Sequence, residues 1–230
     1  SKLQKSTSPR QVESVVSYKW VDGRNYYFWT SIESFSILKL VFATHNDHKL
    51  KEVQQLLPDS IELLSLHDIG CFDEIPETGA TLEENAKIKA DFVTQTYGFN
   101  CFSDDTGLLI DALDGRPGVF SARYAGEGKN AQDNMVKVLK EMKDQTDRNA
   151  HFKTVIHLNW NGKPYAFDGI VEGEITHTQY GEGGFGYDPI FKPLGYDSTF
   201  GELPPETKNV ISHRGKAVQK LVAFLKNLPS

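Results

Sequence analysis

Two adjacent carboxylates, Asp104 and Asp105, are the residues whose position in this sequence points most directly to chemistry. They stand in the segment Ser-Asp-Asp-Thr-Gly, directly after the short apolar run 99–102, which we interpret as a buried strand. Active sites of α/β enzymes lie at such strand ends, and neighbouring buried acids need a metal ion or a lysine as a partner. The competing interpretation is a solvated Asp-Asp turn.

A polar loop near residue 45 has the composition of an anion site. It follows a strand expected over 38–43 and enters a helix expected over 46–57, whose first N–H groups and dipole attract phosphate. Thr44 and Asn46 add side-chain donors, and Lys49 lies one turn into the helix, although no Walker motif is present. The alternative is an ordinary Asn46 N-cap followed by a surface lysine. The six residues of the loop are Thr44, His45, Asn46, Asp47, His48 and Lys49.

A third polar group surrounds the start of the next helix, which a capping-box pattern at Thr81 and a closing glycine predict over 81–97. Asn85 and Lys89 are four residues apart and share one helix face. Together with Glu77 they are expected to face the Asp104–Asp105 edge, since this helix leads directly into that strand. One Glu and one Asp from different elements are the usual protein ligands of Mg²⁺. Alternatively, the acids of the first turn only favour the helix N-terminus.

The glycine-rich segment 181–186 contains a literal GxGxxG, which we reject as a dinucleotide fingerprint. That motif needs a helix to open at its third glycine, and Pro189 follows shortly after it. A nicotinamide-dependent oxidoreductase is therefore not indicated. The glycines are expected instead to let backbone approach a ligand, with Phe185 as a flat platform for a base and Asp188 as an acceptor.

The last polar constellation is Lys208 with the segment Ser212-His213-Arg214. Arg and His at a helix entrance can donate hydrogen bonds to carbonyl or phosphate oxygens. A Ser212 N-cap with flanking solvated charges is the alternative. The segment thus predicts either a recognition site or an ordinary helix start.

The elements that position these residues alternate between strand and helix. Further strands are expected at 61–66, 151–160 and 165–176, the last two joined by the hairpin signal Asn161-Gly162. Helices are expected at about 130–143 and 215–225. This pattern predicts an α/β fold with parallel and antiparallel strands, a mixed twisted sheet flanked by helices.

The amino-acid composition argues against several classes of protein. The chain has 230 residues, 39% of them apolar, and a net charge of −6, which argues against a general nucleic-acid or membrane-surface binder. No apolar stretch reaches the roughly 18 residues of a membrane span. Cys71 and Cys101 show no disulfide framework or metal-ligand spacing, and we expect buried thiols in a reducing, cytoplasmic setting.

Residues 1–36 differ from the rest and are expected to be an N-terminal extension of unknown role before a domain at 37–230. The first part is polar, and aromatic residues crowd the second part. One interpretation is a hairpin that turns at Asp22-Gly23; the other is an unfolded extension.

Five segments together resemble one family, the Ham1/RdgB-like inosine/xanthosine triphosphate pyrophosphatases, which hydrolyse non-canonical purine nucleoside triphosphates. The resemblance covers the chain from about Leu40 to its end. It implies a fold of two lobes with the active-site cleft between them, like that of inosine triphosphatases and Maf proteins. The segments, in family order, are FATHNDHKLKEV, ETGATLEENAKIKA, SDDTGLLIDALDGRPGVFSARYAG, GGFGYDPIF and KNVISHRGKA.

The resemblance also implies roles for single residues. Glu77 and Asp105 match metal-associated acids, with Asp105 as general base for the attacking water, and Thr106 matches a substrate contact. The loop from Thr44 to Lys49 matches the triphosphate site, in which we give His45 and His48 no individual role. Pro76 departs from the family, since many relatives have a second acid there. The base and sugar pocket and the purine-edge readers correspond to Phe185, Gly186, Tyr187, Asp188, Lys208, His213 and Arg214.

The expected reaction is hydrolysis of ITP, dITP or XTP to the nucleoside monophosphate and pyrophosphate. It would use Mg²⁺, with Mn²⁺ as a substitute, and Lys49 and Lys89 would stabilise the departing pyrophosphate. Family members are commonly homodimers. The alternative is a purine nucleotide sensor without catalysis, which would not need Glu77 together with Asp105.

Overall fold

The computed structural model describes residues 13–21, 24–32 and 37–228, and it divides the chain into two compact units, Ser1–Leu38 and Lys39–Ser230. In the first unit, β1 (Glu13–Val21) pairs antiparallel with β2 (Arg24–Ile32), with Val21 opposite Arg24. This pairing agrees with the hairpin interpretation of the N-terminal segment. The expected turn residues, Asp22 and Gly23, lie outside the described residues.

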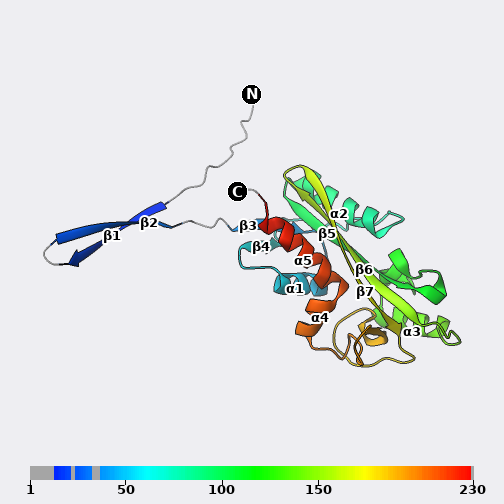
Figure 1. Cartoon of the computed structure of the whole chain (residues 1–230). Coiled ribbons are helices and arrows are strands. Elements are labelled where there is room, and N and C mark those ends of the chain that lie inside the picture. Colours follow the sequence, from blue (N-terminus) through cyan, green and yellow to red (C-terminus); the bar gives the residue numbers. More distant parts are fainter. Residues whose placement is uncertain (1–12, 22–23, 33–36, 229–230) are drawn as a thin grey trace. The chain divides into compact units, whose positions relative to one another are not determined.

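A six-stranded mixed sheet in the order β4-β3-β5-β6-β7-β8 forms the second unit (Figure 1). β3 pairs with β5 in parallel, and the successive pairs from β5 to β8 are antiparallel. The mixed α/β sheet predicted from the sequence is therefore confirmed. The strands are β3 (Leu38–Phe42), β4 (Ile61–Leu64), β5 (Cys101–Ile110), β6 (Asn149–Trp160), β7 (Lys163–Ile175) and β8 (Phe191–Pro193).

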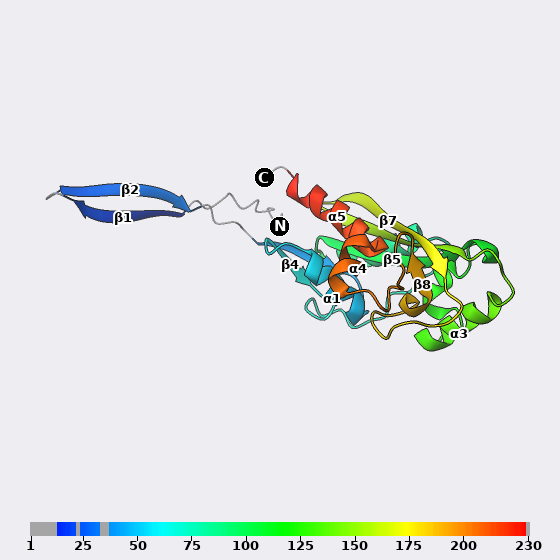
Figure 2. The ribbon, with the colours of Figure 1, turned by 60° about the horizontal axis from the view of Figure 1, so that its bottom comes forward.

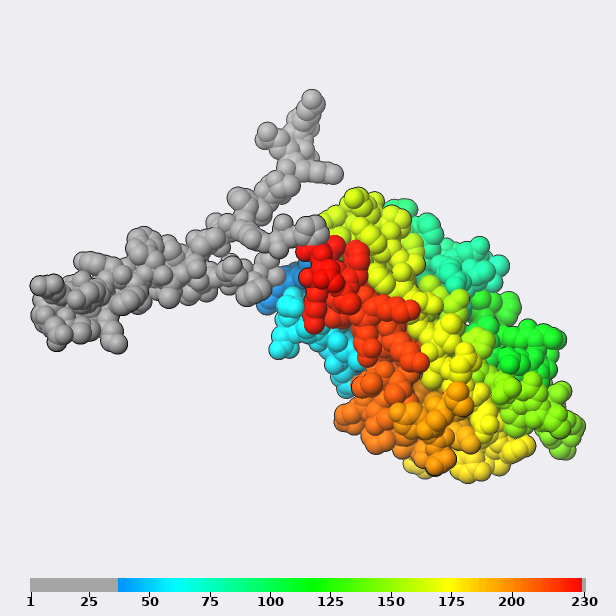
Figure 3. Space-filling model, in the orientation of Figure 1, coloured from blue at the N-terminus to red at the C-terminus, as the bar shows by residue number. Residues whose placement is uncertain are grey.

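Helices cover both faces of this sheet. α2 packs on β5 and β6, whereas α5 packs on β6 and β7, and Figure 3 shows α5 in red beside β7 in yellow. None of the described helices combines the length and apolar character that a membrane crossing requires. The helices are α1 (Asp47–Leu56), α2 (Leu82–Tyr97), α3 (Ala131–Glu141), α4 (Pro205–Ile211) and α5 (His213–Lys226), with 3₁₀ turns at Asp111–Leu113, Gly118–Arg123 and Asp188–Ile190.

Capping residues and turn residues in the sequence predict most ends of the helices and strands correctly. Asn46 caps α1 by accepting hydrogen bonds from the N–H groups of His48 and Lys49, and Thr81 caps α2 by accepting from Glu84 N–H. α2 ends at Gly98 with φ of 76°, the left-handed conformation that glycine adopts most easily. Asn161 and Gly162 also have positive φ and form the two-residue turn between β6 and β7.

Two hydrophobic clusters lie along β5, with a polar stretch between them. Val41, Val93 and Cys101 belong to one cluster, and Leu108 and Phe152 belong to the other. Figure 2 shows β4 and α3 at opposite ends of this unit, as Figure 1 does. Residues 103–106 fall between the clusters, so β5 carries its polar side chains where two separately packed parts meet.

Candidate active site

Strand β5 carries the two acids in its middle, not after its end. The predicted buried strand is present, but its predicted bounds, 99–102, are wrong: Phe99 lies outside the strand and is exposed, while β5 begins at Cys101 and continues through Asp104 and Asp105 to Ile110. The physical reason is the long antiparallel partner β6, which pairs with β5 over its whole length and supplies hydrogen bonds far beyond the apolar run. The solvated-turn alternative is also wrong, because both acids are buried.

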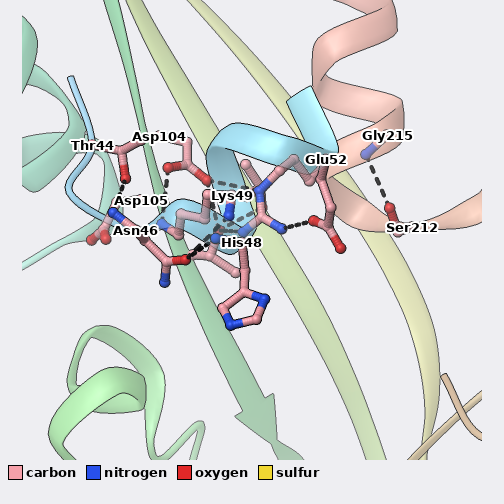
Figure 4. Close-up of polar contacts among 12 residues, drawn as sticks. Thr44, Asn46, His48, Lys49, Glu52, Asp104, Asp105, Ser212 and Gly215 are labelled. Carbon is pink, nitrogen blue, oxygen red and sulfur yellow. Dashed lines mark hydrogen bonds and ion pairs between the residues drawn. The ribbon is translucent and has the colours of Figure 1, made fainter. Parts of the chain in front are cut away.

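Alternation along β5 directs the two carboxylates to opposite faces of the sheet. Asp104 points toward α1 and α5, where its Oδ1 accepts from Lys49 Nζ at 2.9 Å and its Oδ2 accepts from Arg214 Nε at 3.0 Å. Figure 4 shows Asp104 beside Lys49. Burial alone would raise the pKa of Asp104, but the charges of Lys49 and Arg214 outweigh it and hold this pKa well below its ordinary value. Asp104 is therefore a fixed anion between two cations.

Asp105 faces α2 and has weaker partners. Asn85 Nδ2 donates to its Oδ2 at 3.2 Å, and Lys89 Nζ lies 3.5 Å from its Oδ1. Burial raises the pKa of Asp105 above its ordinary value against the opposing charges of Lys89 and Lys49. The expectation that Asn85 and Lys89 face this acid is confirmed.

Glu77 lies with Asp105 and Lys89 on the α2 side of β5. Its Oε1 accepts from Lys89 Nζ at 2.6 Å, and Arg123 Nη1 lies 3.8 Å from its Oε2. Burial would raise the pKa of Glu77, but pairing with Lys89 holds it below its ordinary value. Asp105 and Glu77 thus meet at one ammonium group, which brings two carboxylates from separate elements together.

Sequence reasoning missed Glu52, which lies one turn after Lys49 on α1. Its carboxylate accepts from Lys208 Nζ at 2.6 Å and from Arg214 Nη1. Burial raises its pKa, and the two cations more than reverse that effect. The available signal was the spacing of three residues from Lys49, which places both side chains on one helix face.

The loop from Thr44 to Lys49 is tightly organised by local hydrogen bonds. Asn46 N–H donates to Thr44 Oγ1 at 3.1 Å, and His45 Nε2 lies 3.0 Å from the carbonyl oxygen of Asp73. Asn46 is the N-cap, as the alternative interpretation held, but Lys49 is not a surface lysine, since its amine is buried against an aspartate. Asp47 occupies the first turn of α1.

Phe185 and Lys208 form a further part of the site. Lys208 Nζ lies 4.8 Å and Arg214 Cζ 5.4 Å from the centroid of the Phe185 ring. Lys208 also donates to Asp188 Oδ2 at 2.7 Å. Ser212 caps α5 through Gly215 N–H, but Lys208 and Arg214 are buried, so the alternative of solvated flanking charges is wrong.

The remaining expected pocket residues have structural partners. Asp188 is buried and accepts from Phe185 N–H at 2.7 Å, while the Tyr187 hydroxyl donates to the Ser121 carbonyl at 2.7 Å inside a hydrophobic cluster. Gly186 has φ of 65°. The residues after the GxGxxG form a short 3₁₀ turn that leads directly into β8, in agreement with our rejection of a dinucleotide fingerprint.

Thr106 contacts Arg214, whereas His213, its neighbour in sequence, stacks on a core phenylalanine. The Thr106 hydroxyl is 2.7 Å from that of Thr154 and 3.4 Å from Arg214 Nη2. The His213 ring stacks on Phe152 at 4.6 Å, and within the described residues its Nδ1 has no hydrogen-bond partner. Burial lowers the pKa of His213 well below its ordinary value, so the imidazole is neutral.

Four cations and five acids therefore meet around the middle of β5, drawn from segments far apart in sequence. Each cation is paired with at least one of these acids, and the ion pairs around Asp105 are separate from those around Asp104. Such a site can bind phosphate groups and activate a nucleophile. The residues are Lys49, Lys89, Lys208 and Arg214 with Glu52, Glu77, Asp104, Asp105 and Asp188.

Comparisons with known proteins agree with this arrangement. A sequence profile of the Ham1 family matches residues 40–224. The chain is 61% identical over 188 residues to the dITP/XTP pyrophosphatase of Flavobacterium johnsoniae, covering 82% of this chain and 98% of that protein. It is 46% identical to the dITP/XTP pyrophosphatase of Bacillus subtilis over 80% of this chain and 96% of that protein.

Solved structures give the same result. The Ham1 protein of Staphylococcus aureus is 39% identical with a TM-score of 0.75, and the alignment covers 82% of this chain and 98% of that one. A HAM1 protein from Coxiella burnetii is 41% identical with a TM-score of 0.77, covering 83% of this chain and 100% of that one. The fold described above is thus similar to theirs over nearly their whole length.

Proposed function

The chain belongs to the Ham1 family, and on that premise we propose that it hydrolyses non-canonical purine nucleoside triphosphates such as dITP, ITP and XTP to the monophosphate and pyrophosphate. The relatives named dITP/XTP pyrophosphatase support this reaction, since the chain matches them over almost their whole length. The released monophosphate could no longer be incorporated by a polymerase. The activity would remove damaged purines from the nucleotide pool.

The contrast between Asp104 and Asp105 is the observation that best supports a catalytic role for the site. A general base works best when its pKa lies near the working pH. Burial raises the pKa of Asp105, whereas Lys49 and Arg214 hold that of Asp104 far below its ordinary value. Asp105 is therefore the acid suited to accept a proton from the attacking water, and Asp104 keeps the cations in place.

The donor set at Glu77 and Asp105 fits Mg²⁺. Their carboxylate oxygens converge on one cationic atom, Lys89 Nζ, at 2.6 and 3.5 Å, and Mg²⁺ prefers such hard oxygen donors. Within residues 37–228 no group of three or more acidic, histidine or cysteine side chains is placed to hold a metal ion, so water and substrate phosphates would supply further ligands. When bound, the ion would neutralise phosphate charge and acidify a coordinated water. Mn²⁺ offers similar coordination.

The lysines on the two sides of β5 act on the phosphate chain. Lys49 extends from the first turn of α1 to Asp104, and Lys89 extends from α2 to Glu77 and Asp105. Because both amines already lie among carboxylates, their charge is oriented before substrate arrives, which favours the negative charge that develops on pyrophosphate. We assign triphosphate binding to the loop from Thr44 to Lys49.

We expect Phe185, Lys208 and Arg214 to select the base. Inosine and xanthosine carry an oxygen at C6, where adenosine carries an amino group. Arg214 and Lys208 are donors only, so they match the oxygen and leave an adenine amino group facing another donor. The alternative of a sensor without catalysis would need this group but not Glu77 with Asp105. We further expect a homodimer that works in the cytoplasm.

A substrate panel tests the proposed function. The full chain is incubated with Mg²⁺ and ITP, dITP, XTP, ATP or GTP, and pyrophosphate and orthophosphate are measured separately. We expect pyrophosphate from the first three and little hydrolysis of ATP, whose C6 amino group would face the donors; GTP carries the C6 oxygen, so its rate shows whether its 2-amino group is also rejected. Orthophosphate as the sole primary product, or equal rates for ATP and ITP, would refute the proposal. Omission of the metal with a chelator should abolish turnover.

A further inference from the structure

His48 is the one aromatic side chain of the phosphate loop that reaches the base platform. Its imidazole stacks on the Phe185 ring with centroids 5.3 Å apart and an angle of 20° between the planes. The two residues come from α1 and from the glycine-rich loop. Figure 4 shows the imidazole of His48 pointing away from Asp104 and Glu52, the polar part of the site.

The two stacked rings differ in how firmly they are held. Phe185 N–H donates to the buried carboxylate of Asp188, and the ring lies against Lys208 and Arg214. The main chain of His48 is fixed by the bond from its N–H to Asn46 Oδ1 at 3.0 Å, but its side chain is exposed. Among residues 37–228, the imidazole makes no hydrogen bond. The His48 ring can therefore rotate without breaking a polar contact.

We propose that His48 is the second wall of the base site, so that the purine is held between its imidazole and the ring of Phe185. This inference rests on the proposed function and adds a specificity-determining residue to it. A base between two rings needs a separation of roughly 7 Å, since each stacked contact takes about 3.5 Å. Because the two rings are now in contact, with centroids 5.3 Å apart, the exposed His48 side chain must rotate away from Phe185 to admit a base.

The placement of the donors agrees with this arrangement. Lys208 and Arg214 lie next to the Phe185 ring, so a purine stacked there presents its edge near both cations. Lys49 follows His48 directly on α1 and holds the phosphate side. One helix start thus supplies a contact for the base and a contact for the phosphates.

Comparing the affinities of two ligands, one with a base and one without, shows whether His48 contacts the base or the phosphates. The dissociation constants of inosine monophosphate, which carries the base, and of pyrophosphate, which does not, are measured by calorimetry on the full chain. The variants are His48→Ala, His48→Phe and His67→Ala. His67 is the matched control, because it is also exposed and lies 5.1 Å from a phenylalanine, Phe72, outside the site.

We expect His48→Ala to weaken inosine monophosphate about tenfold, as loss of one aromatic stack on a base does, and to leave pyrophosphate binding within twofold. His48→Phe should retain the affinity, and His67→Ala should not change it. Unchanged or tighter binding in His48→Ala would overturn the proposal, as would an equal loss for pyrophosphate or failure of His48→Phe to retain affinity. If the chain released no pyrophosphate from ITP, the proposed function would fail while the binding result still decided the role of His48.

Discussion

Replacing each of the two neighbouring acids by asparagine should separate stability from catalysis. Asp104→Asn removes the shared anion of Lys49 and Arg214, whose side chains are only 15% and 3% exposed. Arg214 keeps Glu52 as a partner, whereas Lys49 has no second ion pair among the described residues. Breaking a buried pair costs about 3–5 kcal/mol, and the remaining Glu52 contact places the loss near the lower end.

The expected loss is therefore about 3 kcal/mol of unfolding free energy, or a melting temperature lower by roughly 6–12 °C for a domain of this size. Asp105→Asn should behave differently. Since burial raises the pKa of Asp105, its charged form is disfavoured in the folded state, and a neutral asparagine of the same shape should be as stable or more stable at pH 7. Its turnover should fall by about 10² or more from loss of the general base.

Urea and thermal unfolding of both variants, with ITP turnover, check this contrast. Asp168→Asn is the matched control: its partner Lys220 is about half exposed, so the change should cost no more than about 1 kcal/mol. An Asp104→Asn variant no less stable than Asp168→Asn would show that the buried pair does not hold the site together. An Asp105→Asn variant that unfolds as easily as Asp104→Asn, or that keeps near-normal turnover at saturating Mg²⁺, would contradict the different roles assigned to the two acids.

Three further changes test other parts of the account. Arg214→Ala should lower kcat/KM for ITP far more than for ATP, and parallel losses would place base selection elsewhere. Gly169→Ala should destabilise the chain and reduce ITP hydrolysis, because an added Cβ would lie 2.0 Å from the His213 carbonyl oxygen at the start of α5; Gly128→Ala, with open space around it, is the control. Deleting residues 1–36 should leave ITP turnover within about threefold, and a stable but inactive truncated chain would contradict this.

Local chemistry explains what the sequence could predict. The N-caps Asn46 and Thr81, the glycine at 98 and the turn at Asn161-Gly162 act within a few residues, so their geometry follows from their own side chains. The mixed sheet follows from the alternation of these elements. The order of α2 and β5 along the chain also predicts that Asn85 and Lys89 face Asp105, whereas the groups at Lys49 and at Arg214 can be identified only separately.

Long-range pairing explains what the sequence could not predict. The length of β5 depends on β6, some 50 residues later, and no local signal indicates that a strand continues through two adjacent acids. The spacing of Glu52 from Lys49 places both on one helix face, but the partners of Glu52 appear only where α4 and α5 bring Lys208 and Arg214 to it. The two interpretations of the segment at Ser212, a recognition site or a solvated helix start, could be distinguished only by the burial of Lys208 and Arg214 in the folded chain.

Hydrolysis of ITP in ¹⁸O-labelled water shows whether water cleaves the triphosphate to release pyrophosphate, with Asp105 as base. The products of the full chain and of Asp105→Asn are separated and analysed by mass spectrometry. We predict that each turnover places one ¹⁸O atom in either the nucleoside monophosphate or the pyrophosphate and none in orthophosphate. The rate of Asp105→Asn should be at least about 100-fold lower. Labelled orthophosphate with inosine diphosphate, or an unchanged rate in the variant, would contradict the account.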